Sequence, residues 1–231
     1  MKAITIGLAG LVGTAMADMD KMIKTLAKAA RRNESMRALG NDWAADAMAK
    51  IDGYGCWCYL DYASTKGRGR PANEVDNACK LLNDGYQCAI MDGEDENKPC
   101  EPWSVDYTAA AVGDIATIQN SCNRNNRKGR DALCKRRACM VETLFVSSIF
   151  TFLLSGDVVL QHETYNHQFG FDVQAECPIS GDQPSTKQCC GTYPLRYPFK
   201  ELDGARKCCG EKTYNSMNSQ CCPGEVVKAV C

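Results

Sequence analysis

The chain has 231 residues, in which 27 lysines and arginines nearly balance 28 acidic residues, for a formal net charge of −1. This balance leaves no overall positive field to attract nucleic acid, and the charged and apolar fractions are ordinary for a folded protein. The sixteen cysteines are unusual, because thiols at this density are typical of proteins that fold in an oxidising compartment. No two of them have the C-x-x-C spacing, which excludes zinc ribbons and thioredoxin-type redox sites. We therefore expect a secreted, disulfide-bonded protein.

The N-terminus predicts a secretory signal peptide over residues 1–17. Lys2 precedes an apolar run that ends in a small-x-small triplet at 15–17, which predicts cleavage before Asp18. The longest later run without a charge is shorter than the roughly 20 residues that a helix needs to cross the bilayer core, so no membrane span is expected. Asn33, followed by Glu and Ser, is the one acceptor for N-glycosylation.

Residues 18–170 form the first of two regions and carry eight widely spaced cysteines. Apolar residues recur at every third or fourth position over 22–30, which predicts an N-terminal helix with one apolar face. Two further helices are predicted over 74–88 and 129–154. The acidic stretch 92–101 between them is rich in turn residues and predicts a loop.

Residues 171–231 form the second region, in which six of the cysteines are the vicinal pairs 189–190, 208–209 and 221–222. Adjacent cysteines seldom bond to each other, because a disulfide needs Cα atoms about 4.4–6.8 Å apart and suitably directed Cβ atoms. We therefore expect each pair to send two bridges in opposite directions. Prolines and glycines between short stretches that contain Tyr, Phe and Val predict a strand-and-turn module.

All sixteen cysteines are expected to form disulfides, with at most one bridge between the two regions. The pairing itself stays open, because eight cysteines in one region already allow many connectivities. The expected disulfide cysteines are Cys56, Cys58, Cys79, Cys88, Cys100, Cys122, Cys134, Cys139, Cys177, Cys189, Cys190, Cys208, Cys209, Cys221, Cys222 and Cys231.

Three motifs of the first region resemble the secreted phospholipase A2 family: YGCWC at 54–58, GRGRP at 67–71 and DNAC at 76–79. The predicted N-terminal helix, and a late helix with two nearby cysteines, are similar to the same plan. The resemblance implies a three-helix core in which Cys58 bonds to Cys79.

The resemblance covers about residues 18–155, but the residues of its chemistry are replaced. The family uses a His as general base and an adjacent Asp to hold calcium, and these positions are Leu82 and Asn83 here. Asp84 is one residue further along and points about 100° away around a helix. The glycines of the calcium loop are also replaced, and Met140 stands where an Asp follows the late cysteine. We therefore expect no catalytic site and no metal site.

The only two histidines, His162 and His167, could in principle supply a substitute base. Their spacing places them neither on one helix face nor on one side of a strand. We expect them to be surface or edge residues rather than a base beside a carboxylate.

Opposite charges gather in two stretches of the first region. The acidic one could bind calcium through carboxylate oxygens, but it lacks the alternating D-x-D-x-D-G spacing, so an exposed charged loop is the preferred interpretation. The basic one could bind an anionic surface, a glycan or an acidic neighbour, or be a solvated helix end. Together they could steer one copy toward another. The candidate assembly contacts are Asp92, Glu94, Asp95, Glu96, Arg130, Arg136 and Arg137.

The second region resembles the dicysteine repeats of galaxin-type proteins of extracellular and biomineral matrices. The resemblance rests on CCG at 189–191 and 208–210, YN at 214–215 and CCPG at 221–224. It implies a disulfide-stapled module used for structure and contact. An unrelated cystine-rich module is the alternative.

The expected fold class is mainly α, with a disulfide-rich phospholipase A2-like helical domain over 18–170 and a small disulfide-rich strand-and-turn module over 171–231. The expected function is that of a secreted, non-catalytic structural protein that assembles with itself, with matrix proteins or with glycans, without a cofactor. One alternative is a lipid-surface-binding or toxin-like homologue, whose basic amphipathic N-terminal helix contacts membrane. The other, an active calcium-dependent phospholipase, is disfavoured by Leu82 and Asn83.

Overall fold

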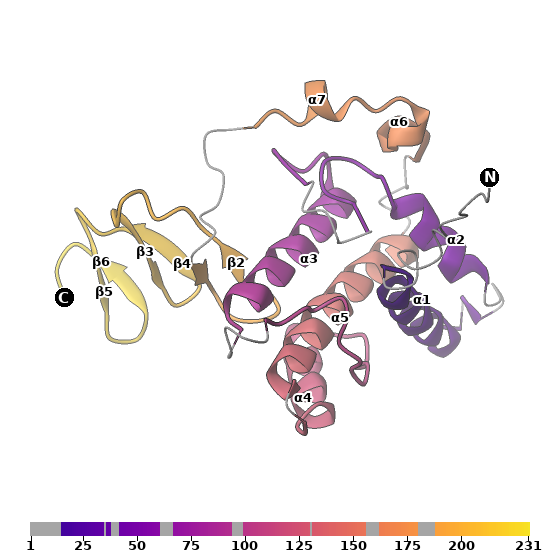
Figure 1. The fold of residues 1–231 in the computed structure, drawn as a ribbon, viewed down its shortest axis with the longest axis horizontal. Coiled ribbons are helices and arrows are strands. Elements are labelled where there is room, and N and C mark those ends of the chain that lie inside the picture. The colour runs from indigo at the N-terminus through magenta and orange to yellow at the C-terminus, as the bar shows by residue number, and fades with distance from the viewer. Residues whose placement is uncertain are drawn as a thin grey trace, which may run out of the picture.

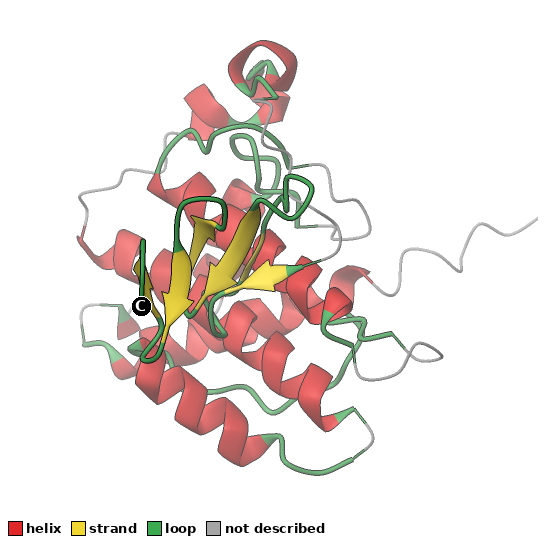
Figure 2. Cartoon of the chain, turned by 90° about the vertical axis from the view of Figure 1, so that its left-hand side faces the viewer, coloured by secondary structure: helices red, strands yellow, loops and turns green. Residues whose placement is uncertain are grey.

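The chain folds into a helical body followed by an arm of three short β-hairpins, which Figure 1 shows side by side and Figure 2 shows with the strands in front. The body is formed by residues up to 179, and the arm by residues 188–231. The structure is a computed structural model that describes residues 15–34, 36–37, 42–60, 67–93, 99–129, 131–155, 162–179 and 188–231.

Three of the helices confirm the predicted helices, whereas α2, α4 and the short elements α6, η2 and α7 were not predicted. The confirmed ones are α1, α3 and α5, whose ends lie within a few residues of the predicted ones wherever a range was predicted. Helix α4 was missed because only Ile118 and Cys122 on it are buried, which leaves almost no apolar pattern. The helices are α1 (Ala15–Arg32), α2 (Asp42–Ile51), α3 (Glu74–Met91), α4 (Ile115–Asn125), α5 (Ala132–Ser155), α6 (His162–Tyr165), the 3-10 helix η2 (His167–Phe169) and α7 (Val173–Glu176).

The predicted signal peptide lies mostly outside the described residues. Only its last three residues are described, and they belong to the first turn of α1. Cleavage before Asp18 therefore stays a prediction.

The core of the body lies between α3 and α5, with α1 and α4 packed along α5. Leu82 and Phe145 are fully buried at this interface. Gly85 lets the two helices approach closely, because a Cβ placed there would lie 2.6 Å from Cγ2 of Val141. The packing therefore requires a small residue at this position.

Side-chain caps set the beginnings of α3 and α4. Asn73 Oδ1 accepts a hydrogen bond from the Asp76 backbone N–H at 3.1 Å. Asp114 Oδ1 accepts one from the Thr117 backbone N–H at 2.7 Å. Each cap satisfies a backbone donor that has no partner inside its helix, so both helices begin where the sequence supplies an Asn or Asp.

Helix α5 is long and apolar enough, by length and composition alone, to cross a membrane, and it is the one such helix in the described part of the chain. Half of its apolar window is buried inside the molecule. The central helix of a water-soluble core meets the same criterion, so this feature does not by itself indicate a membrane span.

The arm consists of three antiparallel pairs of strands, which confirms the predicted strand-and-turn character of the second region. In the middle hairpin Cys209 pairs with Lys212, and Gly210 begins the two-residue turn with a positive φ of 58°. Glycine is the residue type that such a turn requires at its first position. The strands are β1 (Cys189–Cys190), β2 (Tyr197–Pro198), β3 (Arg206–Cys209), β4 (Lys212–Asn215), β5 (Gln220–Cys222) and β6 (Val226–Lys228).

Eight disulfides join all sixteen cysteines, which confirms that the chain is fully paired. The bond between Cys58 and Cys79, implied by the phospholipase A2 resemblance, is present. Each vicinal pair bonds in two directions, as predicted, so that successive hairpins are linked in a row. The bridges are Cys56–Cys177, Cys58–Cys79, Cys88–Cys189, Cys100–Cys134, Cys122–Cys139, Cys190–Cys208, Cys209–Cys221 and Cys222–Cys231.

The expectation of at most one bridge between residues 18–170 and 171–231 is wrong, because two are present. Cys177 bonds to Cys56, and Cys189 bonds to Cys88 near the end of α3. The first of these arises because the segment around α7 packs on the helical core, where Cys177 is completely buried. The second attaches the arm itself.

Candidate functional site

The position expected for a general base is occupied by the hydrophobic core. Leu82 on α3 is 1% exposed and packs among apolar side chains. Its neighbour Asn83 is half-buried, and its Oδ1 accepts a hydrogen bond from the Gln87 side-chain amide at 2.7 Å. Neither residue can accept a proton from water, so this turn of α3 offers no base.

Asp84, the next residue along α3, is bound by a lysine of the same helix. Its buried carboxylate accepts a hydrogen bond from Lys80 Nζ, and the two form an ion pair one helical turn apart. Burial raises the pKa of Asp84, and the Lys80 charge opposes this rise. The Lys80 ammonium also lies 5.1 Å from the centre of the Trp57 ring. The carboxylate of Asp84 is therefore buried and already paired with Lys80.

A buried carboxylate that sequence reasoning missed lies on α5. Glu142 is 1% exposed and accepts hydrogen bonds from the hydroxyl groups of Tyr86, at 2.6 Å, and Tyr107. Met140, where the family resemblance leads one to expect an Asp, is also buried. The sequence signal was an acid inside an otherwise apolar helix, since a buried acid needs hydrogen-bond donors. With two tyrosines bound to it, Glu142 joins α5 to α3 and to the loop before α4.

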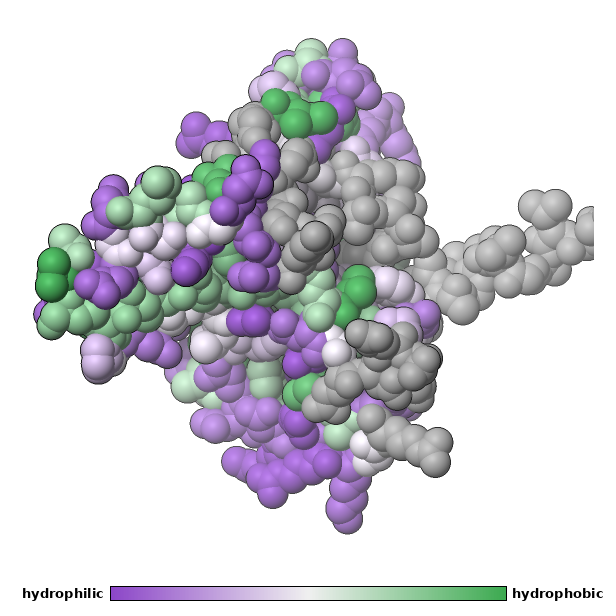
Figure 3. Space-filling view, turned by 60° about the vertical axis from the view of Figure 1, so that its left-hand side comes forward, coloured by the Kyte–Doolittle hydropathy of each residue, from purple (hydrophilic) through white to green (hydrophobic). Residues whose placement is uncertain are grey.

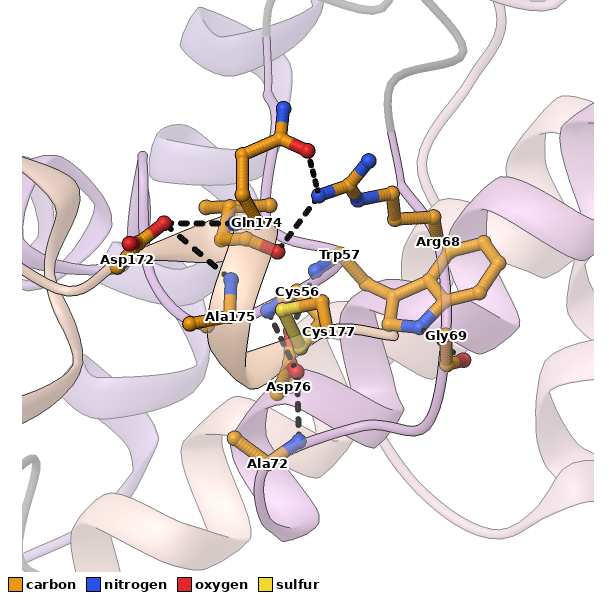
Figure 4. Close-up of a disulfide and its surroundings, with 12 residues drawn as sticks. Cys56, Trp57, Arg68, Gly69, Ala72, Asp76, Asp172, Gln174, Ala175 and Cys177 are labelled. Atoms are coloured by element: carbon orange, nitrogen blue, oxygen red, sulfur yellow. Dashed lines mark hydrogen bonds between the residues drawn. A yellow bond between two sulfur atoms is a disulfide. The ribbon is translucent and has the colours of Figure 1, made fainter. Parts of the chain in front are cut away.

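The YGCWC loop is held by a third buried acid, Asp76 (Figure 4). Its carboxylate accepts hydrogen bonds from the backbone N–H groups of Cys56 at 2.8 Å, Trp57 at 2.7 Å and Ala72 at 2.8 Å. Burial raises the pKa of Asp76, whereas these hydrogen bonds lower it. Gly55 is needed here, because a Cβ on it would lie 2.4 Å from the Asp76 carboxyl carbon. The motif thus builds a rigid loop around a structural carboxylate.

His167 packs against this loop and forms no contact with Asp84. Its Nε2 lies 2.7 Å from the Gly55 carbonyl oxygen, and its ring stacks on Phe171 with centroids 6.1 Å apart. The nearby α7 is fastened by Arg68, whose Nη2 donates to the Val173 carbonyl oxygen at 2.8 Å (Figure 4). His167 therefore has a packing role, and the side chain of His162 lies outside the described residues.

Two of the candidate assembly contacts meet within the chain. Asp92 forms a two-point ion pair with Arg196 of the arm, with Nε–Oδ2 at 2.6 Å and Nη2–Oδ1 at 3.1 Å. Tyr193 donates its hydroxyl to the same carboxylate at 3.0 Å. Arg137 donates to the Asp92 backbone carbonyl oxygen at 2.6 Å and lies over the Tyr193 ring. Asp92 and Arg137 thus hold the arm on the body, and they are not free poles for another copy.

The remaining candidates are placed as follows. Arg136 is half-buried and lines a hollow beside the arm. Glu94, Asp95, Glu96 and Arg130 lie outside the described residues. Among the residues that the structure describes, no three His, Cys, Asp or Glu side chains are grouped so that they could hold a metal ion.

Asn33 follows the end of α1, where its Oδ1 accepts a hydrogen bond from the Met36 backbone N–H at 3.3 Å. Ser35 of the glycosylation motif lies outside the described residues. Modification of this asparagine therefore stays a prediction.

Comparison with known proteins adds no further constraint, because no family model and no solved structure matches the chain. The two resemblances rest on the motifs themselves. What the geometry establishes is a disulfide-rich, mainly α-helical protein with three small hairpins. Eight disulfides indicate folding in an oxidising, extracellular or secretory environment.

Proposed function

We propose that this chain is a secreted, non-catalytic structural protein that assembles with copies of itself, or onto a matrix, through the free end of its arm. The proposal is supported by the lack of a free acid or base where the phospholipase A2 resemblance would place one. Leu82 lies in the core, and the carboxylates of Asp84 and Glu142 are bound by neighbouring side chains. A fold without these groups can still serve as a rigid block.

The arm is suited to such a role because it is attached to the body at its beginning and cross-linked along its length. Disulfides link each hairpin to the next, and Cys222 bonds to the C-terminal Cys231. At the body, the arm is attached by Cys189 and by the ion pair of Arg196. A contact made at its free end would therefore be transmitted to the whole molecule.

The observation that carries the proposal is the apolar surface at this free end (Figure 3). Val226 and Val227 on β6 are 47% and 38% exposed, and Val230 is 78% exposed. Within residues 188–231, the middle hairpin is bonded by disulfides to a hairpin on either side, whereas β5–β6 is bonded to one other hairpin. Burying apolar area against a second copy would contribute up to about 25 cal/mol per Å² toward association, against the cost of fixing the two copies together.

Charged substitutions at the free end test the proposal. We expect Val226→Asp/Val230→Asp to remain monomeric in light scattering at concentrations at which the unmodified protein forms large species. The control is Ile179→Asp, which places a charge at an equally exposed aliphatic residue of the body. Unmodified protein that stays monomeric at high concentration, across salt and calcium, would contradict the proposal.

The lipid-surface binder is the second candidate, and α1 argues against it. Lys24 and Lys28 of this helix are exposed, but Met22 and Leu26 are completely buried in the core. A helix that binds a membrane surface inserts its apolar face, and this face is already occupied. Only the positive charge of α1 is open to a bilayer.

A further inference from the structure

A hollow of about 740 Å³ lies between α4, α5 and the first hairpin, at the place where the arm joins the body. Its size is that of a small-molecule site and far exceeds the space that one inorganic ion needs. Polar and apolar surface contribute about equally to its lining, and the polar side chains include Asn120, Asn123, Arg136, Arg137, Thr192 and Arg196. It is separate from the former active-site position at Leu82, which does not line it.

The hollow has an excess of positive charge. Asp92, the one carboxylate that the described residues contribute to the lining, is matched by Arg196 in the two-point ion pair. Arg137 donates to a backbone carbonyl oxygen and lies over the Tyr193 ring with its Cζ 5.5 Å from the centre, and no carboxylate of the described residues forms an ion pair with it. Within the described residues, Arg136 has neither a hydrogen bond nor an ion pair. The guanidinium group of Arg136 therefore remains for a ligand.

The uncharged polar side chains that line the hollow could form hydrogen bonds with the hydroxyl groups of a ligand. The side-chain amides of Asn120 and Asn123 are exposed and have no hydrogen bonds to described residues, and the Thr192 hydroxyl is also exposed. A guanidinium group binds sulfate, phosphate or carboxylate oxygens in pairs, which adds direction to the charge. The apolar part of the lining includes Leu133, Met140 and Tyr193.

We propose that this hollow is a binding site for a sulfated saccharide, with Arg136 as the main contact to the sulfate and the two asparagines as contacts to sugar hydroxyl groups. The site does not depend on self-association, because the end of the arm that carries Val230 is not part of its lining. Body and arm both contribute, so the ligand would also bridge the two parts of the chain.

The test is calorimetric titration of the full secreted chain with a heparin-derived tetrasaccharide, at an ionic strength of about 0.15 M to screen distant charges. Arg136→Gln is expected to weaken binding by at least about tenfold, since a charge-assisted hydrogen bond is lost. The matched control is Arg124→Gln, which removes the same charge from an exposed site on α4 outside the hollow and should change affinity less than about twofold. The desulfated tetrasaccharide should not bind.

Three results would overturn the proposal. These are the absence of binding by the unmodified protein, an equal loss for Arg136→Gln and Arg124→Gln, and equal binding of the desulfated sugar. Vesicles containing phosphorylated inositol lipids form a separate arm of the experiment. If they bind through Arg136 while the tetrasaccharide does not, the site recognises a lipid headgroup and the saccharide proposal fails.

Discussion

Single residues of the helical body show how the fold accommodates buried acids. Asp76 binds three backbone N–H groups, Asp84 binds Lys80, and Glu142 binds two tyrosine hydroxyl groups. A buried carboxylate is costly unless such donors surround it, and here every donor comes from the fold itself. These acids therefore stabilise the packing of loops and helices.

The absence of phospholipase chemistry is a prediction at this scale. We expect neither the unmodified protein nor Leu82→His to release fatty acid from mixed phospholipid vesicles, with or without calcium. The new imidazole would lie in the core beside Asn83, which carries no charge for a metal ion. Circular dichroism would verify that the variant is folded. Release of fatty acid that a chelator abolishes would contradict this expectation.

Asp84 also predicts a pH dependence of stability. Burial raises its pKa above the usual 3.8, so the folded chain holds this proton more tightly than the unfolded chain does. The contribution of Asp84 to the free energy of unfolding is then fully present below about pH 3.8 and falls as pH rises through the folded-state pKa.

The variant Asp84→Asn lacks this titration. Urea unfolding of both proteins from pH 3.5 to neutral, a range of about three to four pH units, should show the unmodified protein losing stability relative to Asp84→Asn as pH rises. A difference that grows in favour of the unmodified protein would mean that the Lys80 charge outweighs burial.

Among the elements, the contact between α3 and α5 limits which residues are possible at one point. Gly85→Ala places a methyl group 2.6 Å from a Val141 methyl group, too close for both to remain in place. We expect a loss of about 1–3 kcal/mol from overpacking, offset in part by up to about 1 kcal/mol of added helix propensity. Thermal unfolding measures the net effect.

The double variant Gly85→Ala/Val141→Ala separates overpacking from other causes. Removing the Val141 methyl groups makes room, so the added alanine should cost less in this background than in the unmodified one. Equal costs in both backgrounds would show that the helices adjust without strain.

For the whole molecule, the attachment of the arm is the decisive feature. The Cys88–Cys189 bridge closes a loop that Cys56–Cys177 already shortens, so its loss should cost about 3–4 kcal/mol. In Cys88→Ser/Cys189→Ser we expect the body to stay folded. Hydrogen exchange should accelerate at the junction around Tyr193, since the non-covalent contacts there, which include the Asp92 ion pair and the hydrogen bonds of Tyr193, would then hold the arm.

Adding Arg196→Gln to that variant removes the ion pair as well. Exchange at the junction should then rise further, while the middle hairpin, which keeps its own disulfides, stays protected. Loss of protection throughout the arm would indicate that its hairpins depend on the body for their stability.

The sequence by itself determined which main helices form and how the vicinal cysteines bond. Helical patterns of apolar residues predicted α1, α3 and α5, and adjacent cysteines predicted two bridges that leave each pair in different directions. These signals are local, and so sequence spacing is enough to reveal them. The resemblance to phospholipase A2 motifs, rather than the apolar period, places Leu82 and Asn83 at the positions of a base and a metal ligand.

Only the tertiary structure decided which distant residues meet. Asp92 and Arg137 have opposite charges on separate segments, and nothing in the sequence indicates that they hold Arg196 and Tyr193 of the arm. The number of bridges between the two regions, the tyrosines on Glu142 and the hollow beside Arg136 likewise depend on long-range packing. Such contacts arise from the way helices and hairpins pack together, and short-range patterns in the sequence do not predict them.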